Sequence, residues 1–543
     1  MWELRRSGVR PACGGRRRTR IGPPGVSSQR APAGAAAGLR TRWVFALALA
    51  LHAALELALP GFPDRDAWFH GRLAELLAHG GARWDGSAFP WLTHSAYADH
   101  PVDWSLAWHW AVAPLAAAFG PVAGLRIAAV LQAAALTAAV HALLRRHGVR
   151  AATAWTALLL AGSAPWVFRL HFGRPTPCVL TLLVLTLDAV LRGRDRVAAL
   201  AAGASLLVYQ VPAPLLLVGG AGLAGRALAE RRLPLRTAGW LCAGAALGIV
   251  VHPAFHHWPD GRPLTLHLWG LLQGSLRVAA NGGAAVLPGG ETLVLPLPGE
   301  LLPPAPARLG TELWFATSAT AAALAGLWRG RRDAAVVACT ALALAGLAGT
   351  LRSGRFFEYW HVFALLGAAC SLSGPAAPGG VRAHRQIVGA AAALLALAAL
   401  PAYLRLARER APDRGADLRP ALAAVDARAR DGDVVWHGSW DDFAPLFHFA
   451  PRLRFVTGMD PWWLVAHDAD DARAYAAAGA GLLDDAALHA ALVERFGARF
   501  VVLWRSPDAR APRRYAALEA QLRAAGWATP LHDDAAAIAF EVR

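Results

Sequence analysis

The sequence contains no lysine, so all 54 of its basic side chains are arginines. This bias and the abundance of alanine are typical of a GC-rich genome, and we infer no function from them. Cysteine is also scarce, and the five residues of this type are scattered, mostly in apolar runs, at Cys13, Cys178, Cys242, Cys339 and Cys370. Their spacing excludes a disulfide framework and a cysteine-type zinc site. The zinc motif HExxH is absent as well.

Charged side chains make up only 17% of the 543 residues, against roughly a quarter in soluble proteins. Hydrophobic residues make up 56%, the mean hydropathy is +0.35, and apolar runs long enough to cross a bilayer recur. We therefore predict a polytopic α-helical membrane protein. The net charge of +17 comes mostly from arginines in short loops, which we interpret as membrane topology and not as nucleic-acid binding.

The apolar runs predict about eleven membrane spans. They lie near residues 43–60, 121–144, 151–168, 176–191, 197–209, 212–228, 236–252, 311–328, 333–350, 359–373 and 386–404. If the N-terminus is cytoplasmic, Arg-rich loops such as RRHGVR and RGRRD all fall on the cytoplasmic side, as the positive-inside rule requires. The segments that then face outward include 61–120, 253–310 and the residues after about 405.

We expect three parts in the chain. Residues 1–41 are rich in Arg, Gly and Pro, which predicts a disordered, basic cytoplasmic tail. Residues 42–405 would form the multi-span membrane domain. In residues 406–543, GDVVWHG and ARFVVLW predict buried strands, and DLRPALAAVDARARDG and DDAALHAALVERFGA predict helices. This last part is therefore expected to be a small extracytoplasmic α/β domain, and no Rossmann or P-loop glycine pattern accompanies it.

The first outer loop, residues 61–120, is too long and too polar to be only a connector. It opens with PDRDAWFHGR, and its segment HPVDWSLAWHWAVAPLAAAFG predicts an interfacial amphipathic helix. The candidate substrate-binding residues of this loop are Asp64, His70, Arg72, Asp103 and His109. The alternative for each is a solvated loop with helix caps, and a metal site would require carboxylates that converge on one cation.

The segment DAWFHGR resembles the first-loop motif of GT-C-type membrane glycosyltransferases, especially the catalytic subunits of oligosaccharyltransferases. The order of parts is also similar: a first span, a long acidic outer loop, many further spans and a C-terminal outer domain. The resemblance implies that Asp66 is the catalytic residue, acting as base or as the carboxylate that positions the acceptor. Asp64 is the weaker candidate for that role.

The sequence departs from the family pattern at two places. SWDDF stands where the family has Trp-Trp-Asp-Tyr-Gly, so a peptide acceptor is not expected, although Trp440, Asp441 and Asp442 stay candidate substrate contacts. The second outer loop, RLHFGR, lacks the carboxylates that the family usually places there. A metal-free reaction with one aspartate as base therefore fits better than a two-motif metal site, and a divalent ion such as Mg²⁺ or Mn²⁺ stays an alternative.

Sugar transfer from a lipid-linked phosphate donor requires cations where charge develops on the leaving phosphate. Arginines lie at the outer ends of several spans, and a planar guanidinium binds phosphate well. The candidates are Arg169, Arg174, Arg352 and Arg355, with His171 and Glu358 as weaker neighbours. The alternative for each arginine is snorkelling toward lipid headgroups.

The sequence thus predicts a multi-pass cell-membrane glycosyltransferase that moves a sugar from a polyprenyl-phosphate-linked donor to an extracytoplasmic glycan, lipid or protein. Two other functions stay open. One is a non-catalytic GT-C-fold protein in envelope polysaccharide assembly. The other is a transporter or flippase, which is disfavoured because ionisable residues gather outside the spans, with Asp188 as the main acid within one.

Overall fold

The computed structural model describes residues 39–80, 89–99, 101–254, 302–373, 378–410, 416–505 and 515–543, with short pieces between 273 and 294. The predicted tail, residues 1–41, lies almost entirely outside the described residues, and so does most of the predicted outer loop 253–310. Residues 39–543 belong to one compact unit.

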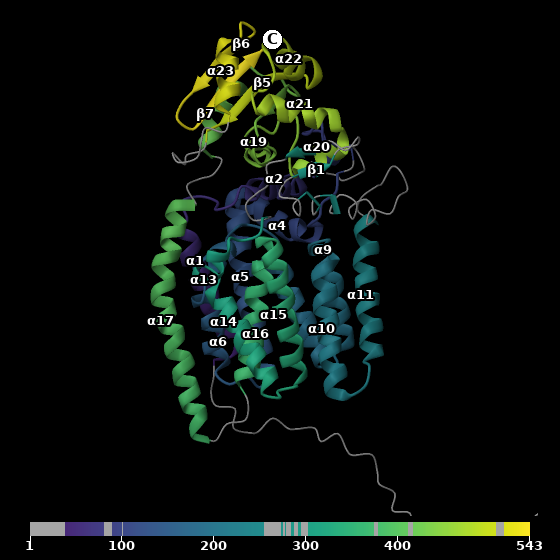
Figure 1. Cartoon of the computed structure of the whole chain (residues 1–543), viewed down its shortest axis with the longest axis vertical. Coiled ribbons are helices and arrows are strands. Elements are labelled where there is room, and N and C mark those ends of the chain that lie inside the picture. The colour runs from purple at the N-terminus through teal and green to yellow at the C-terminus, as the bar shows by residue number, and fades with distance from the viewer. Residues whose placement is uncertain are drawn as a thin grey trace, which may run out of the picture. The chain divides into compact units, whose positions relative to one another are not determined.

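The chain up to residue 410 is built mainly from helices (Figure 1). Every segment expected to span the membrane is largely helical. The helices are α1 (Thr41–Leu57), α5 (Pro121–Arg146), α6 (Ala152–Ala161), α7 (Ala164–Arg169), α8 (Thr176–Leu191), α9 (Asp195–Val208), α10 (Pro212–Glu230), α11 (Leu235–Ala254), α14 (Trp314–Trp328), α15 (Ala334–Arg352), α16 (Phe357–Leu372) and α17 (Pro378–Arg410).

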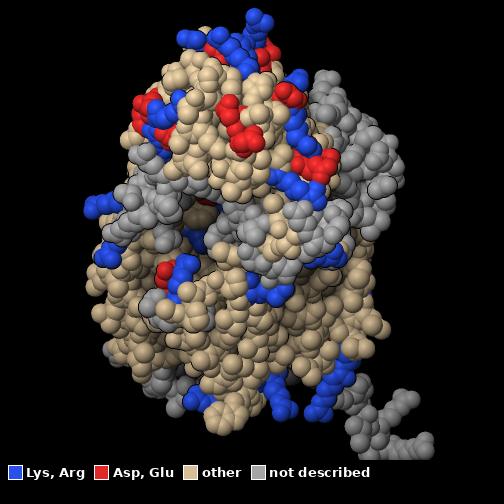
Figure 2. All heavy atoms as spheres, turned by 45° about the horizontal axis from the view of Figure 1, so that its top comes forward, with Lys and Arg blue, Asp and Glu red and all other residues tan. Residues whose placement is uncertain are grey.

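Four of the described helices, α5, α10, α15 and α17, are long and apolar enough to cross a membrane. Apolar helices of 10–17 residues add to these, among them α6, α8 and α4 (Leu106–Phe119). Figure 2 shows a broad band without charged side chains, with arginines below it and charges of both signs above it. This distribution is that of a protein with an apolar belt, while the number of spans stays a prediction.

The segment 151–168, expected as one span, is interrupted. Helix α6 ends before Gly162, and α7 begins after Ser163, whose hydroxyl accepts a hydrogen bond from the Trp166 amide at 3.3 Å. A serine N-cap followed by Pro165 in the first turn favours a new helix start. The short α7 places Arg169 at its last position.

Helices α9 and α11 cross where both present small residues. Gly244 and Gly248 of α11 lie against Ala199 and Gly203 of α9 so closely that an added Cβ would press on backbone atoms of α9. Small residues four apart allow this approach of two helices within a membrane.

We expect Gly244→Ala to destabilise the protein by about 1–3 kcal/mol, because the new methyl group would overlap the Ala199 carbonyl. Gly239→Ala on the same helix is the matched control, since a Cβ there meets no atom within 4 Å and alanine favours helix by about 1 kcal/mol. Thermal unfolding in detergent should rank Gly239→Ala at or above wild type and Gly244→Ala below it. Equal midpoints for the two variants would contradict the close crossing.

Residues 416–543 contain a five-stranded sheet in the order β4-β3-β5-β7-β6. Its strands are β3 (Val434–His437), β4 (Arg454–Phe455), β5 (Ala498–Trp504), β6 (Ala528–Asp533) and β7 (Ala537–Val542). The strands predicted at GDVVWHG and ARFVVLW are β3 and β5. The predicted helices correspond to α18 (Arg419–Asp426) and to α22 (Asp485–His489) with the π-helix Ala490–Arg495 that follows it.

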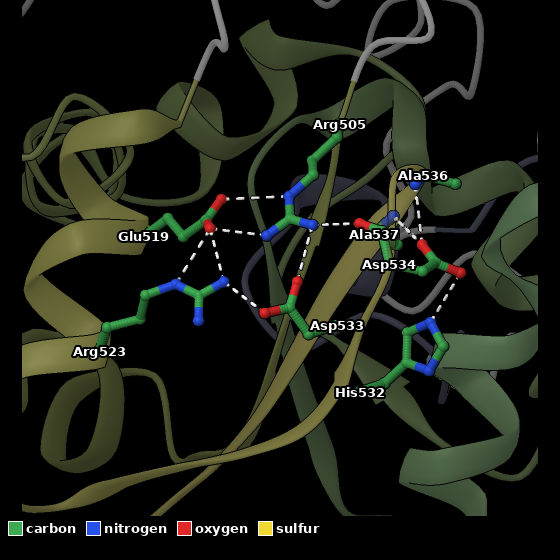
Figure 3. A network of polar contacts seen from close by, with 8 residues as sticks. All are labelled: Arg505, Glu519, Arg523, His532, Asp533, Asp534, Ala536 and Ala537. Atoms are coloured by element: carbon green, nitrogen blue, oxygen red, sulfur yellow. Dashed lines mark hydrogen bonds and ion pairs between the residues drawn. The ribbon is translucent and has the colours of Figure 1, made fainter.

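A network of ion pairs braces one edge of this sheet (Figure 3). Arg505, directly after β5, contacts Glu519 of α23 (Ala516–Ala524) at 2.6 Å and Asp533 of β6 at 2.8 Å. Arg523 of α23 contacts the same two carboxylates. The hydrogen bonds from Arg523 and Arg505 lower the pKa of Asp533. The network therefore ties α23 to the ends of β5 and β6, two strands that β7 separates in the sheet.

The first outer loop packs against the C-terminal sheet. The Thr93 amide donates to the Phe455 carbonyl at 3.0 Å, and the Phe455 amide donates to the Trp91 carbonyl at 2.8 Å, so residues 91–93 extend the sheet beside β4. Helix α2 (Asp66–Ala78) packs on α19 (Phe443–Phe449), with the Phe69 ring 6.0 Å from that of Phe447. These contacts fix α2, and with it Asp66, against the C-terminal part.

Candidate active site

A cavity of about 510 Å³ lies where the segments 63–66, 165–174, 302–313 and 354–357 meet the C-terminal part. The surface is hollowed beside acidic and basic side chains in the space-filling view (Figure 2). Its charged lining residues are Asp64, Arg65, Asp66, Arg169, Arg174, Arg308, Glu312, Arg355, Asp441 and Asp460. Its apolar lining includes Pro165, Phe168, Phe172, Leu302, Leu313, Phe357 and Leu406. Both charged and apolar side chains therefore line the cavity.

Two aspartates and an arginine of the cavity lining contact one another. The Arg174 guanidinium holds the Asp64 carboxylate with two hydrogen bonds, Nε to Oδ2 and Nη2 to Oδ1, the latter at 2.8 Å. The same Nη2 lies 3.0 Å from Asp66 Oδ2. The Asp66 side chain is 45% exposed and that of Asp64 only 11%. Of the two aspartates, Asp66 is thus the accessible one.

The remaining arginines of the cavity differ in their surroundings. Arg169 Nε donates to Glu358 Oε1 at 2.5 Å, and Arg308 Nη2 donates to Glu312 Oε2 at 2.6 Å. Arg355 lines the cavity from the short turn between α15 and α16. Several guanidinium groups therefore surround one space, although carboxylates within the protein hold at least three of them in this state.

A buried chain of hydrogen bonds begins one helical turn after Asp66. His70 Nδ1 lies 2.8 Å from His109 Nε2, and His109 Nδ1 donates to the Asp103 carboxylate at 2.7 Å. Burial, followed by the charges of His109 and Arg174, lowers the pKa of His70 well below its ordinary value. With His70 neutral, its Nδ1 and His109 Nε2 share one hydrogen bond, and the chain links α2 to α4.

Arg65 joins the first outer loop to the C-terminal part. Its Nη1 lies 2.7 Å from Asp441 Oδ2 and 3.2 Å from Asp442 Oδ1. Its guanidinium lies 3.6 Å from the centre of the Trp504 ring, which is a cation–π contact. Arg65 is the N-cap residue of α2, so these contacts join the start of α2 to the C-terminal part.

The structure brings seven of the sequence-predicted residues to the cavity: Asp64, Asp66, Arg169, Arg174, Arg355, Trp440 and Asp441. The other six are not among its lining residues. His70, Asp103 and His109 form the chain behind α2, and Asp442 is buried against Arg65. Arg72 contacts Glu75 at 2.5 Å, and Arg352 is exposed at the end of α15.

Sequence reasoning missed several residues. Arg65 lies between the two aspartates, but only the fold shows that it contacts the C-terminal part. Asp460, in GMDPWW, caps α20 (Pro461–His467) by accepting from the Trp462 amide at 2.8 Å, and an Asp-Pro pair is a local signal for such a cap. Glu56 of α1 is a second buried acid within the apolar helices beside Asp188, and it lies 2.6 Å from His171 Nδ1.

The described residues do not fit the alternative of a divalent metal. Mg²⁺ and Mn²⁺ prefer several oxygen ligands, and the cation nearest Asp64 and Asp66 is already a guanidinium. Within the described part of the chain, no group of three or more His, Cys, Asp or Glu side chains is arranged to hold a metal ion.

Solved structures show which fold this is. One similar structure is the oligosaccharyltransferase AglB from Archaeoglobus fulgidus, with an inhibitory peptide and a dolichol-phosphate. It has a TM-score of 0.54 and 15% identity, over 86% of this chain and 69% of that one. Another is ArnT from Cupriavidus metallidurans, bound to undecaprenyl phosphate, with a TM-score of 0.52 and 14% identity over 92% of this chain and 98% of that one.

A third similar structure is the arabinofuranosyltransferase AftD from Mycobacteria, with a TM-score of 0.55 and 19% identity. The match covers 93% of this chain and 40% of that one. All three are GT-C membrane glycosyltransferases, and the chain has the GT-C fold. No family model matches the sequence, and no curated protein matches it significantly.

Proposed function

We propose that this protein transfers a sugar from a polyprenyl-phosphate-linked donor to an acceptor outside the cytoplasm. The proposal rests on the cavity, which is lined by an accessible carboxylate, several guanidinium groups and apolar side chains. A sugar linked through phosphate to an apolar lipid chain has the chemical groups that such a lining can bind. The lipid phosphates named with AglB and ArnT, which share this fold, support the same class of donor.

Asp66 is the proposed base, because its carboxylate is accessible in the cavity and can accept the proton of an acceptor hydroxyl as the new bond forms. Arg169 and Arg355 are proposed to stabilise the negative charge that develops on the leaving phosphate. For this role Arg169 would have to release Glu358 and bind the phosphate instead. Phe168, Phe172 and Phe357 would contact the lipid. Trp440 and Asp441 would then lie on the acceptor side.

The orientation follows from the positive-inside rule. We propose a cytoplasmic N-terminus with the tail 1–41, a membrane domain 42–405, and an extracytoplasmic domain 406–543. The cavity, which the 440–441 and 459–460 turns help to line, would then open outside the cytoplasm. The acceptor is a glycan, a lipid or a protein, and no nucleic acid takes part.

The test compares a deletion strain complemented with wild type, with Asp66→Asn, or with the control Asp431→Asn. Asp431 is 85% exposed and is not a lining residue of the cavity. Surface glycans and lipid-linked sugars are then extracted and profiled. We expect Asp66→Asn to reproduce the deletion, with a lipid-linked sugar accumulating and a glycan lost, while Asp431→Asn restores the wild-type profile.

Two other results would redirect the proposal. If the deletion changes the glycans but Asp66→Asn restores them, Asp66 is not the base, and a non-catalytic role in envelope polysaccharide assembly becomes the better explanation. If the deletion changes no glycan and no lipid-linked sugar, sugar transfer is wrong and transport is the function to test.

A further inference from the structure

Two carboxylates two residues apart in sequence converge on one cation from the next outer loop. Arg174 forms two hydrogen bonds with Asp64, one of them at 2.8 Å, and its Nη2 also lies 3.0 Å from Asp66. The planar fork of a guanidinium suits this arrangement, because it can serve one carboxylate with two N–H groups and share an edge with another.

Two linked hydrogen bonds hold the backbone of Arg174. Gln132 Nε2 donates to the Arg174 carbonyl at 2.8 Å, and Trp108 Nε1 donates to Gln132 Oε1 at 3.1 Å. The preceding Gly173 has φ +66°, which favours glycine, and an added Cβ there would press on Leu125 and Ala67. The chain is thus turned so that residue 174 points at α2, and the guanidinium is a fixed part of the site.

The charges of this group do not suit a second cation. Arg174 offsets part of the negative charge of Asp64 and Asp66, and Asp66 is the more exposed of the two carboxylates. A divalent ion bound by both carboxylates would have to displace Arg174 or lie against it. Like charges at contact distance repel strongly where the group is only partly solvated.

We propose that Arg174 is the built-in counter-ion of the Asp64–Asp66 pair, that it excludes divalent metal from this site, and that the site works without one. The inference concerns the same cavity as the proposed function, but its test is a binding measurement that needs no sugar transfer, so the two can fail separately.

The test is titration of the purified full-length protein with Mn²⁺, with the free ion followed by electron paramagnetic resonance. The samples are wild type, Arg174→Gln, Arg174→Lys, and Arg169→Gln as the matched control from the same loop. Arg169 contacts Glu358 and lines the same cavity. Thermal unfolding of each sample confirms that it is folded.

We expect no saturable Mn²⁺ binding by wild type, Arg174→Lys or Arg169→Gln. Arg174→Gln should gain a single saturable site, which a second change, Asp66→Asn, removes. Saturable binding to wild type that Asp66→Asn abolishes would overturn the inference. A folded Arg174→Gln variant that binds no more Mn²⁺ than wild type would overturn it as well, because the guanidinium would then not be what keeps the ion out. If Arg174→Gln does not fold, the Mn²⁺ titrations of wild type and of Asp66→Asn still test the inference.

Discussion

Replacing Asp66 by asparagine is expected to lower the rate of sugar transfer by about 10²–10⁴-fold, the usual contribution of a general base. The amide has nearly the shape of the carboxylate but cannot take the proton of an acceptor hydroxyl. Because the Asp66 side chain is 45% exposed, the change should leave the protein folded. The measurement is transfer by purified protein from the donor that the lipid-linked sugar profile identifies.

Asp64→Asn is the matched comparison, since Asp64 is mostly buried and is held by two hydrogen bonds from Arg174. We expect this change to act through the position of Arg174, with a smaller loss of rate and a lower thermal midpoint. If Asp64→Asn lowers the rate more than Asp66→Asn while both proteins stay equally stable, the two aspartates have the opposite roles.

Replacing Arg65 by alanine should destabilise the protein by about 2–4 kcal/mol, because it breaks contacts to two carboxylates and one ring at once. The Asp442 side chain, only 5% exposed, would lose its contact with the Arg65 guanidinium. The start of α2 would also lose its link to the C-terminal part, so transfer should fall although Arg65 is not the base. Thermal unfolding in detergent and the transfer rate measure the two effects.

Arg452→Ala provides the control for Arg65. Arg452 pairs with Asp426 and Asp431, whose side chains are exposed, and exposed pairs of this kind contribute about 0–1 kcal/mol. Its loss should leave stability and transfer close to wild type. Equal effects of Arg65→Ala and Arg452→Ala would show that the contact between the first outer loop and the C-terminal part is no more important than a surface ion pair.

The sequence specified the helices and strands well where the signal is local. Apolar runs such as 121–144 and 333–350 are helical because a run of that length can satisfy its backbone hydrogen bonds only within itself in lipid. The strands at GDVVWHG and ARFVVLW follow from short β-branched and aromatic runs between turns. The break in 151–168 was missed, although the Ser-Ala-Pro cap at residues 163–165 is also a local signal.

The motif in the first outer loop could be found from residue types alone, because acids, aromatics and an arginine beside an apolar run are unusual together. What the sequence did not reveal is which residues share a cavity. Asp66 and Arg174 are more than a hundred residues apart, and Arg65 and Asp441 are farther still. Only the packing of α2 against α19 and the turn at Gly173 bring these residues into contact.

The sequence by itself thus determined the apolar helices, the elements of the C-terminal part and the candidate carboxylate, since these depend on hydrophobicity and on near neighbours in the chain. The tertiary structure alone decided that Asp66 is accessible, that Asp64 is held by Arg174, and that His70 faces the buried His109. The physical reason is that ion pairs and buried hydrogen bonds join groups that are distant in sequence, and no local pattern records the distance between them.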